Sequence, residues 1–129
     1  MDDKTRKYDL EDRLIDFATT IIDMMELLPD TRAGNHIANQ MLRSGTSAAP
    51  NYGEAQSAES RKDFIHKMKI ALKELRETRV WLRIILRKSL AHPAKQAESG
   101  LLECQELIRI FAKSIKTAES KQNKSPSGT

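Results

Sequence analysis

Apolar residues recur along the chain at alternating spacings of four and three residues, in four separate stretches. This spacing places them on one face of an α-helix. We call each row of such positions a seam. The seam positions over 10–28, 64–85 and 97–115 are almost entirely apolar, whereas those over 37–55 turn small and polar after Met41. The pattern predicts an all-α protein, an antiparallel up-down four-helix bundle. Long helices exchanged between subunits are the alternative.

Breaks between the seams set the expected boundaries. We predict one domain over residues 1–119, with helices at about 9–28, 31–57, 61–90 and 93–118. Pro50 should kink or divide the second helix, because proline lacks an N–H and clashes with the preceding turn. Ser60 can cap the third helix. The last ten residues, 120–129, contain no apolar side chain and are predicted to form a disordered tail.

Composition narrows the class of protein. Charged residues make up 31% of the chain and aromatic residues 5%, and Cys104 is the single cysteine, so no intramolecular disulfide can form. The acidic, polar start is unlike a secretory signal, and no apolar run approaches the roughly 18 residues of a membrane span. We therefore expect a cytoplasmic protein without a membrane partner.

Catalytic and metal-binding patterns are missing from the sequence. The three histidines, His36, His66 and His92, fall on three different segments, and none belongs to a Glu-x-x-His pair of the kind that holds metals in bundles. Cys104 lies on the apolar seam of the fourth helix, where a thiol is a small apolar core group. No nucleophile elbow or glycine-rich phosphate loop occurs. We expect a protein that is not an enzyme and has no metal or cofactor.

Polar residues in the second helix form a candidate site. They share one face if the helix is continuous, at spacings of four, four and three. The residues are Arg43, Ser47, Asn51 and Glu54. They could line a ligand site or an active site, or form a buried polar network that fixes helix register, with Glu54 neutralising Arg43 or Arg79. We favour the network.

Charge is distributed unevenly along the chain. The net charge is +4, but residues 1–30 hold nine acidic and four basic groups, a net of −5, and residues 61–90 hold ten basic and three acidic groups, a net of +7. This asymmetry predicts electrostatic partnering, within an assembly or with another molecule.

Six cations of the third helix, which we call the basic stripe, follow spacings of 7-4-3-7-4 opposite the apolar seam. They are Lys62, Lys69, Lys73, Arg76, Arg83 and Arg87. Such a row suits nucleic-acid phosphates. Two other interpretations stand beside this one. The stripe could contact an acidic first helix of a neighbouring subunit, or it could be ordinary solvated surface. The acidic residues in question are Asp9, Asp12, Asp16 and Asp23.

The third helix is also unusually apolar between Val80 and Leu86. Trp81 and Ile84 widen its apolar surface beyond the single face that a bundle requires. The excess predicts either an oligomer interface or a wide core stripe.

Residues 37–90 resemble a known family. The stretch IANQMLRSGTSAAPNYGEAQSAESRKDFIHKMKIALKELRET carries the resemblance. Its Arg43, Ser47, Asn51 and Glu54, followed by a helix with Phe64, Ala71, Glu74 and Leu75, match the pattern of the bacterial four helix bundle proteins, also called 23S rRNA intervening-sequence proteins. One departure is Ala55, where the family commonly has glycine, so the break after the second helix should come a few residues later.

The resemblance implies a bundle that assembles into a ring-like homo-oligomer, a pentamer, and a similarity to accessory proteins of diversity-generating retroelements. It does not imply an enzyme. Together with the basic stripe, it leads us to expect a non-enzymatic accessory scaffold that binds RNA or DNA through modest, non-sequence-specific phosphate contacts. A protein encoded nearby is a further possible partner. The alternative is a homo-oligomeric protein–protein interaction module without a nucleic-acid role.

Overall fold

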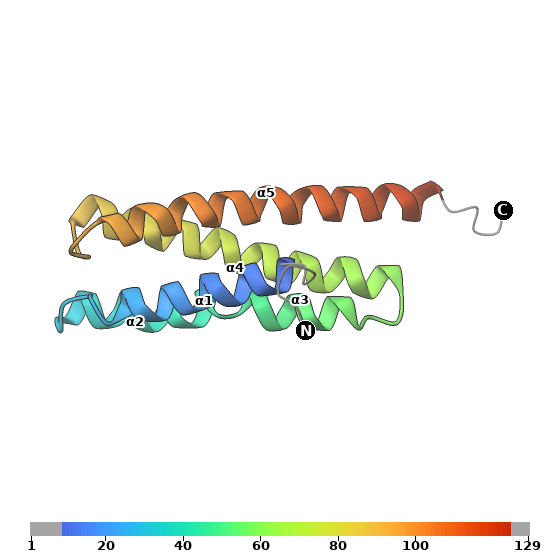
Figure 1. The fold of residues 1–129 in the computed structure, drawn as a ribbon. Helices are drawn as coiled ribbons and strands as arrows, with labels where there is room; N and C mark the ends of the chain where they lie inside the picture. The colour runs from blue at the N-terminus through green and yellow to red at the C-terminus, as the bar shows by residue number, and fades with distance from the viewer. Residues whose placement is uncertain (1–8, 125–129) are drawn as a thin grey trace, which may run out of the picture.

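The computed structural model describes residues 9–124, and this part of the chain is all-helical. Its helices are α1 (Leu10–Met25), α2 (Arg32–Gly45), α3 (Ala48–Gln56), α4 (Arg61–Lys88) and α5 (Lys95–Lys124). α2 and α3 lie end to end, so together they occupy one of the four positions of an elongated bundle (Figure 1). The chain reverses direction after α1, after α3 and after α4 (Figure 1).

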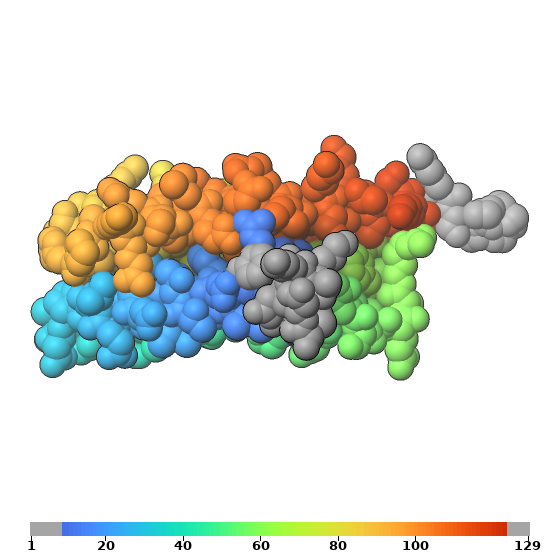
Figure 2. Space-filling model, in the orientation of Figure 1, coloured from blue at the N-terminus to red at the C-terminus, as the bar shows by residue number. Residues whose placement is uncertain are grey.

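The apolar seams form the core, as the spacing predicted. Most seam positions are buried, and each large apolar side chain removed from water contributes about 1.5–3 kcal/mol. The most enclosed side chains include Leu14, Ile21, Met24, Met41, Met68, Leu75, Leu82, Ile85, Leu107 and Phe111. The space-filling view shows α5 along one long edge of the molecule and α1 and α2 along the opposite edge (Figure 2).

α1 begins where the sequence predicted and ends earlier. Asp9 caps it, and its carboxylate accepts from the backbone N–H of Asp12 at 2.9 Å in a capping box. The helix ends at Met25 rather than near residue 28. The amides of Leu27 and Leu28 bond to carbonyls three residues back, which tightens the chain into a turn before Pro29.

The second predicted helix is divided rather than kinked. α2 ends at Gly45 and α3 begins at Ala48, so the break lies at residues 46–47, one turn before Pro50. This is where a proline ring disturbs a helix, because it clashes with the carbonyl four residues earlier and has no N–H to bond it. Thr46 closes α2 with its hydroxyl and its amide, both of which donate to the Leu42 carbonyl.

The packing of α2 against α1 depends on a missing side chain. A Cβ atom built on Gly45 would lie 2.8 Å from Cγ2 of Ile21, closer than side chains approach.

Ser44, a polar residue of the second seam, has its hydrogen-bond partner in α4. The hydroxyls of Ser44 and Thr78, both fully buried, share a 2.9 Å hydrogen bond between α2 and α4.

α4 matches its predicted range closely. Ser60 caps it, its hydroxyl accepting from the Asp63 amide at 3.0 Å, which confirms the cap predicted from the sequence. The helix ends at Lys88, and Ser89 follows in the left-handed conformation with φ of 52°. α3 continues one residue past Ala55, whose side chain is buried, and ends at Gln56.

The last helix begins two residues after its predicted start and extends six residues past its predicted end. α5 starts at Lys95. The amide of Glu98 donates to the carbonyl of Ala94, which therefore flanks the first turn, and Pro93 precedes the helix. It then runs to Lys124, and residues 120–124 are helical rather than disordered. A lack of apolar residues does not end a helix when neither glycine nor proline is present, and the buried Ala118 anchors this last part. Residues 125–129 of the predicted tail lie outside the described residues.

Candidate functional site

The basic stripe lies on the exposed surface of α4. All six of its members, Lys62 to Arg87, are exposed along this one helix. At 1.5 Å per residue, the 25 residues between the first and the last span roughly 37 Å. The stripe borders α5, since Lys69, Lys73 and Arg76 share a groove with residues of that helix.

The groove between α4 and α5 has a cavity volume of about 540 Å³. Its floor is apolar and its rim is charged. The floor is formed by Leu72, Ala112 and Ile115, and the rim by Lys69, Lys73, Arg76, Lys116 and Glu119. Four cations against one carboxylate give a net charge of +3. We call this the basic groove.

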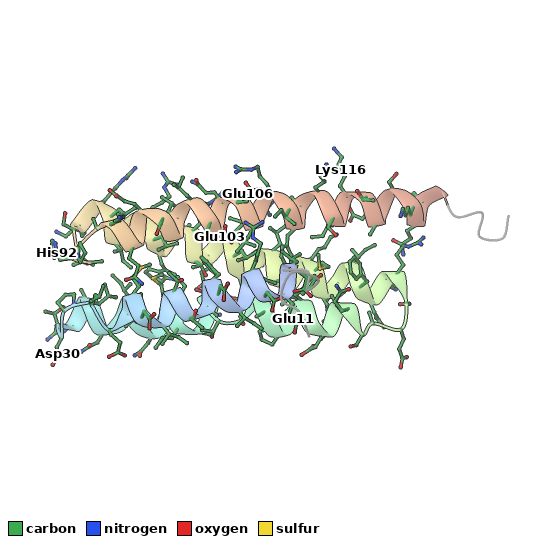
Figure 3. The ribbon with its side chains drawn as sticks, viewed as in Figure 1. Glu11, Asp30, His92, Glu103, Glu106 and Lys116 are labelled. Carbon is green, nitrogen blue, oxygen red and sulfur yellow. The ribbon has the colours of Figure 1, made fainter. Side chains whose placement is uncertain are left out.

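Lys116 is the cation of the basic groove that sequence reasoning missed. It comes from α5, and its side chain points away from the bundle (Figure 3). The sequence does place Lys116 at the edge of the α5 seam, because it follows Ile115 directly and lies four residues after Ala112. Recognising it requires knowing which flank of α5 meets the basic stripe, and that follows from helix packing alone.

A second, smaller hollow lies farther along α4. Its volume is about 220 Å³, and it is lined by Val80, Arg83, Ile84 and Arg87. The remaining member of the basic stripe, Lys62, lines neither this hollow nor the basic groove. Five of the six stripe residues are therefore distributed over two depressions, each of which combines apolar and cationic side chains.

Most of the stripe is not neutralised within the described residues. Lys69 forms a 2.9 Å salt bridge with Glu119 of α5, with both side chains about half exposed. The other five cations form no salt bridge within residues 9–124. An exposed pair such as Lys69–Glu119 contributes roughly 0–1 kcal/mol, so it opposes an incoming anion only weakly.

A larger hollow, of about 650 Å³, lies where the α3–α4 connection meets the end of α5. Arg61 and Lys121 contribute positive charge to it, and Glu59 contributes negative charge. With a net charge of +1 it concentrates less charge than the basic groove. We therefore place the candidate site in the basic groove.

Arg43, predicted to join a buried network, instead forms an exposed clamp between α2 and α4. Its guanidinium donates to Glu74 at 3.0 Å and to Glu77, whose carboxylate also accepts from the Trp81 indole at 3.2 Å. The hydrogen bond from Arg43 holds the pKa of Glu77 below its usual range, and the bond to Glu77 raises the pKa of Arg43. The Arg43 side chain is 51% exposed, so solvent weakens the pair.

The other three residues of the predicted network do not connect with Arg43. Asn51 donates to the backbone carbonyl of Ser47 at 2.9 Å, and Glu54 pairs with Lys67 at 2.6 Å rather than with Arg43 or Arg79. Glu54 is 58% exposed. The prediction of a single buried network was wrong because the helix divides before Ser47, so that the residues on either side of the break no longer share a face.

Cys104 is enclosed in the core. Its side chain is fully buried, its thiol donates to the Leu75 carbonyl at 3.2 Å, and burial raises the pKa of Cys104 to about 12. The thiol is therefore protonated at neutral pH. No group of three or more metal-ligating side chains occurs within the described residues.

A thiol reagent tests this assignment. At pH 8 the native protein is expected to react with 5,5′-dithiobis(2-nitrobenzoate) at least about 10³-fold more slowly than the protein unfolded in guanidinium, because the thiolate is the reactive form. The absorbance of the released thionitrobenzoate reports the rate. A native rate close to the unfolded one would mean that Cys104 is accessible.

Comparison with known proteins places the bundle in a family. The model of the family described as 23S rRNA-intervening sequence protein matches residues 6–113. The chain belongs to this family. The match spans α1 to α4 and most of α5, and thus contains the whole basic stripe, whereas Lys116 lies beyond it.

This member of the 23S rRNA-intervening sequence family is similar to a protein of known structure. It is a protein of unknown function from the S23 ribosomal protein family of Bacteroides thetaiotaomicron, 35% identical to this chain. The similarity covers 84% of this chain and 99% of that one, with a TM-score of 0.76. A search of curated proteins finds no match. Within residues 9–124, no helix combines the length and apolar character needed to cross a membrane.

Proposed function

We propose that this member of the 23S rRNA-intervening sequence family is a non-enzymatic, cytoplasmic accessory scaffold that binds RNA or DNA through the phosphate backbone. The observation that carries the proposal is the basic groove, with its net charge of +3 contributed by two helices. Cations that neutralise phosphates release condensed counterions, which favours binding without requiring any base contact.

The lining of the groove supports binding without sequence selectivity. Its floor is aliphatic, and no aromatic side chain is present in it to stack on a base. Three of its four cations are lysines, which act as point charges toward phosphate. Such contacts fix the register of a protein on nucleic acid and carry no sequence information. The affinity is expected to be modest and strongly salt-dependent.

The proposal includes self-assembly into a ring-like homo-oligomer, with the five subunits that the family resemblance implies. Exposed apolar side chains support an assembly, since Leu102 is 68% and Val80 is 49% exposed. Val80 lies beside Trp81 and Ile84 in the apolar part of α4, where the sequence indicated more apolar surface than one bundle requires. A ring would also place several copies of the basic groove on one nucleic-acid molecule.

A second candidate function is a protein–protein module in which the basic stripe contacts an acidic surface. The observation in its favour is the exposed, acidic side of α1, which includes Asp9, Asp16 and Asp23. α1 of one copy could then meet α4 of the next.

Native mass spectrometry of the variant Lys73→Glu/Arg76→Glu separates the two candidates. If the stripe binds nucleic acid, the variant keeps the native mass of the wild-type assembly and loses binding to labelled duplex DNA and structured RNA. If the stripe is a subunit contact, the assembly dissociates. If neither property changes, the stripe is solvated surface and both proposals are wrong.

A further inference from the structure

One end of the bundle, formed by α3, the start of α4 and the end of α5, has no fourth helix among the described residues. α1 spans 16 residues, whereas α4 spans 28 and α5 spans 30. α3, α4 and α5 therefore extend past the start of α1, which Asp9 caps (Figure 1). The hollow of about 650 Å³ lies at this end, and no residue of α1 lines it. We call it the terminal hollow.

The floor of the terminal hollow combines one aromatic ring with small apolar side chains. It is formed by Phe64 of α4, Ala55 of α3 and Ala118 of α5. Phe64 is only partly buried, and it belongs to neither of the two ring–ring contacts found among the described residues. A partly exposed ring beside alanines, which add little bulk, is a surface on which a planar ring can stack.

The rim of the terminal hollow carries polar side chains without a partner within residues 9–124. Arg61 and Lys121 supply positive charge, Glu59 supplies negative charge, and Ser114 and Thr117 supply hydroxyls. None of these five side chains forms a hydrogen bond or a salt bridge in that part of the chain. A carboxylate and hydroxyls suit the edge of a nucleobase, and the two cations suit a phosphate.

The terminal hollow lies next to the basic stripe, and α5 borders both the hollow and the basic groove. Lys62, the stripe cation that lines neither of the other depressions, directly follows Arg61. Phe64 and Lys69 are five residues apart, about 8 Å along α4 and roughly two nucleotide steps of a strand. A strand whose backbone follows the stripe can therefore place its last nucleotide in the hollow.

We propose that the terminal hollow binds one unpaired nucleotide, with its base on the ring of Phe64 and its phosphate on Arg61 and Lys121. The volume of about 650 Å³ falls in the range of small-molecule sites, about 300–1,000 Å³. This inference rests on the proposed function, and it adds to the phosphate contacts of the basic groove a preference for nucleic acid with a single-stranded end. Stacking on one ring tolerates any base, so the site selects the unpaired state rather than a sequence.

Two overhangs of equal charge test whether a base is bound. The probes are DNA duplexes with a short overhang of adenines, or with the same overhang built from abasic nucleotides, which keep the phosphates and lack the bases. Phe64→Leu keeps an apolar floor without the ring, and Phe64→Tyr keeps the ring. Arg61→Gln/Lys121→Gln removes the two cations of the rim. Its matched control is Lys88→Gln/Lys95→Gln, because these exposed lysines lie at the opposite ends of the same two helices.

At about 50 mM salt, we expect the wild type to bind the adenine overhang about tenfold or more tightly than the abasic overhang. Phe64→Leu should abolish this difference and Phe64→Tyr should keep it, with the affinity for a blunt duplex unchanged in both. Arg61→Gln/Lys121→Gln should lower the affinity for the adenine overhang about tenfold, against less than about threefold for the control. Fluorescence anisotropy measures the affinities, and thermal unfolding checks that each variant is folded.

Adenosine monophosphate, titrated by calorimetry, separates a free nucleotide from the end of a strand. If the wild type binds all duplexes alike whether or not the overhang carries bases, the nucleotide pocket is wrong and the phosphate-binding groove stands. If the wild type binds the monophosphate through Phe64 but no duplex, the proposed function fails and the hollow is a site for free nucleotides. If it binds neither, both proposals are overturned.

Discussion

Reversing two charges in the basic groove, by Lys73→Glu/Arg76→Glu, is expected to lower the affinity for duplex DNA at about 50 mM salt by at least roughly 100-fold. Each removed phosphate contact weakens binding and lowers the salt slope by about one, and each new carboxylate adds repulsion. Both residues are exposed, so the fold should be unaffected. Fluorescence anisotropy of a labelled duplex measures the affinity.

The matched control is Arg32→Glu/Lys95→Glu. These two cations are also exposed, line neither the basic groove nor the adjoining hollow, and change the net charge by the same amount. The control should lose less than about tenfold in affinity, since distant charges are screened beyond a Debye length of about 10 Å at 0.1 M salt. Equal losses in the two variants would show that net charge, rather than the groove, determines binding. Circular dichroism of both variants checks that the helices are intact.

The substitution Gly34→Ala is expected to destabilise the protein by about 3 kcal/mol or more. A Cβ atom on Gly34 would lie 2.1 Å from the backbone carbonyl oxygen of Pro29, and a backbone atom cannot move aside as a flexible side chain can. Gly34 also lies in the first turn of α2, where its amide donates to the Thr31 hydroxyl at 3.0 Å. The clash therefore disturbs the helix cap together with the α1–α2 connection. Urea unfolding monitored by circular dichroism gives the change in free energy.

Gly53→Ala is the control for this prediction, because the same atom is added to a helical glycine. A Cβ atom on Gly53 would meet nothing within 4 Å. Alanine in a helix is more favourable than glycine by roughly 0.5–1 kcal/mol, so this variant should be as stable as the wild type or slightly more stable. If Gly34→Ala behaved like Gly53→Ala, the close approach between Pro29 and α2 would be wrong.

The helices could be predicted from the sequence wherever apolar spacing and a capping residue coincide. Asp9 and Ser60 start α1 and α4 as predicted, because each has a side-chain oxygen that accepts from an amide three residues on. The end of α5 could not be predicted in this way. Residues 120–124 have no apolar pattern, and the helix extends because nothing in them breaks it.

The candidate site was predictable only in part, for a related reason. The cations of α4 are visible in the sequence because they repeat on one helix. Lys116 becomes part of the site only through the packing of α5 against α4, which periodicity does not specify. The prediction that Arg43 and Glu54 belong to one network was wrong for a different reason. Their spacing places them on one face only if the helix is continuous, and the helix divides between them, one turn before Pro50.

The salt dependence of wild-type binding tests the central claim most directly. Affinity for a labelled DNA duplex is to be measured at about 50 and 200 mM salt. With about four to six phosphates neutralised by the basic stripe and Lys116, affinity should fall about 10²- to 10³-fold over this range. No binding at 50 mM salt, or an affinity that does not change with salt, would contradict a phosphate-binding groove.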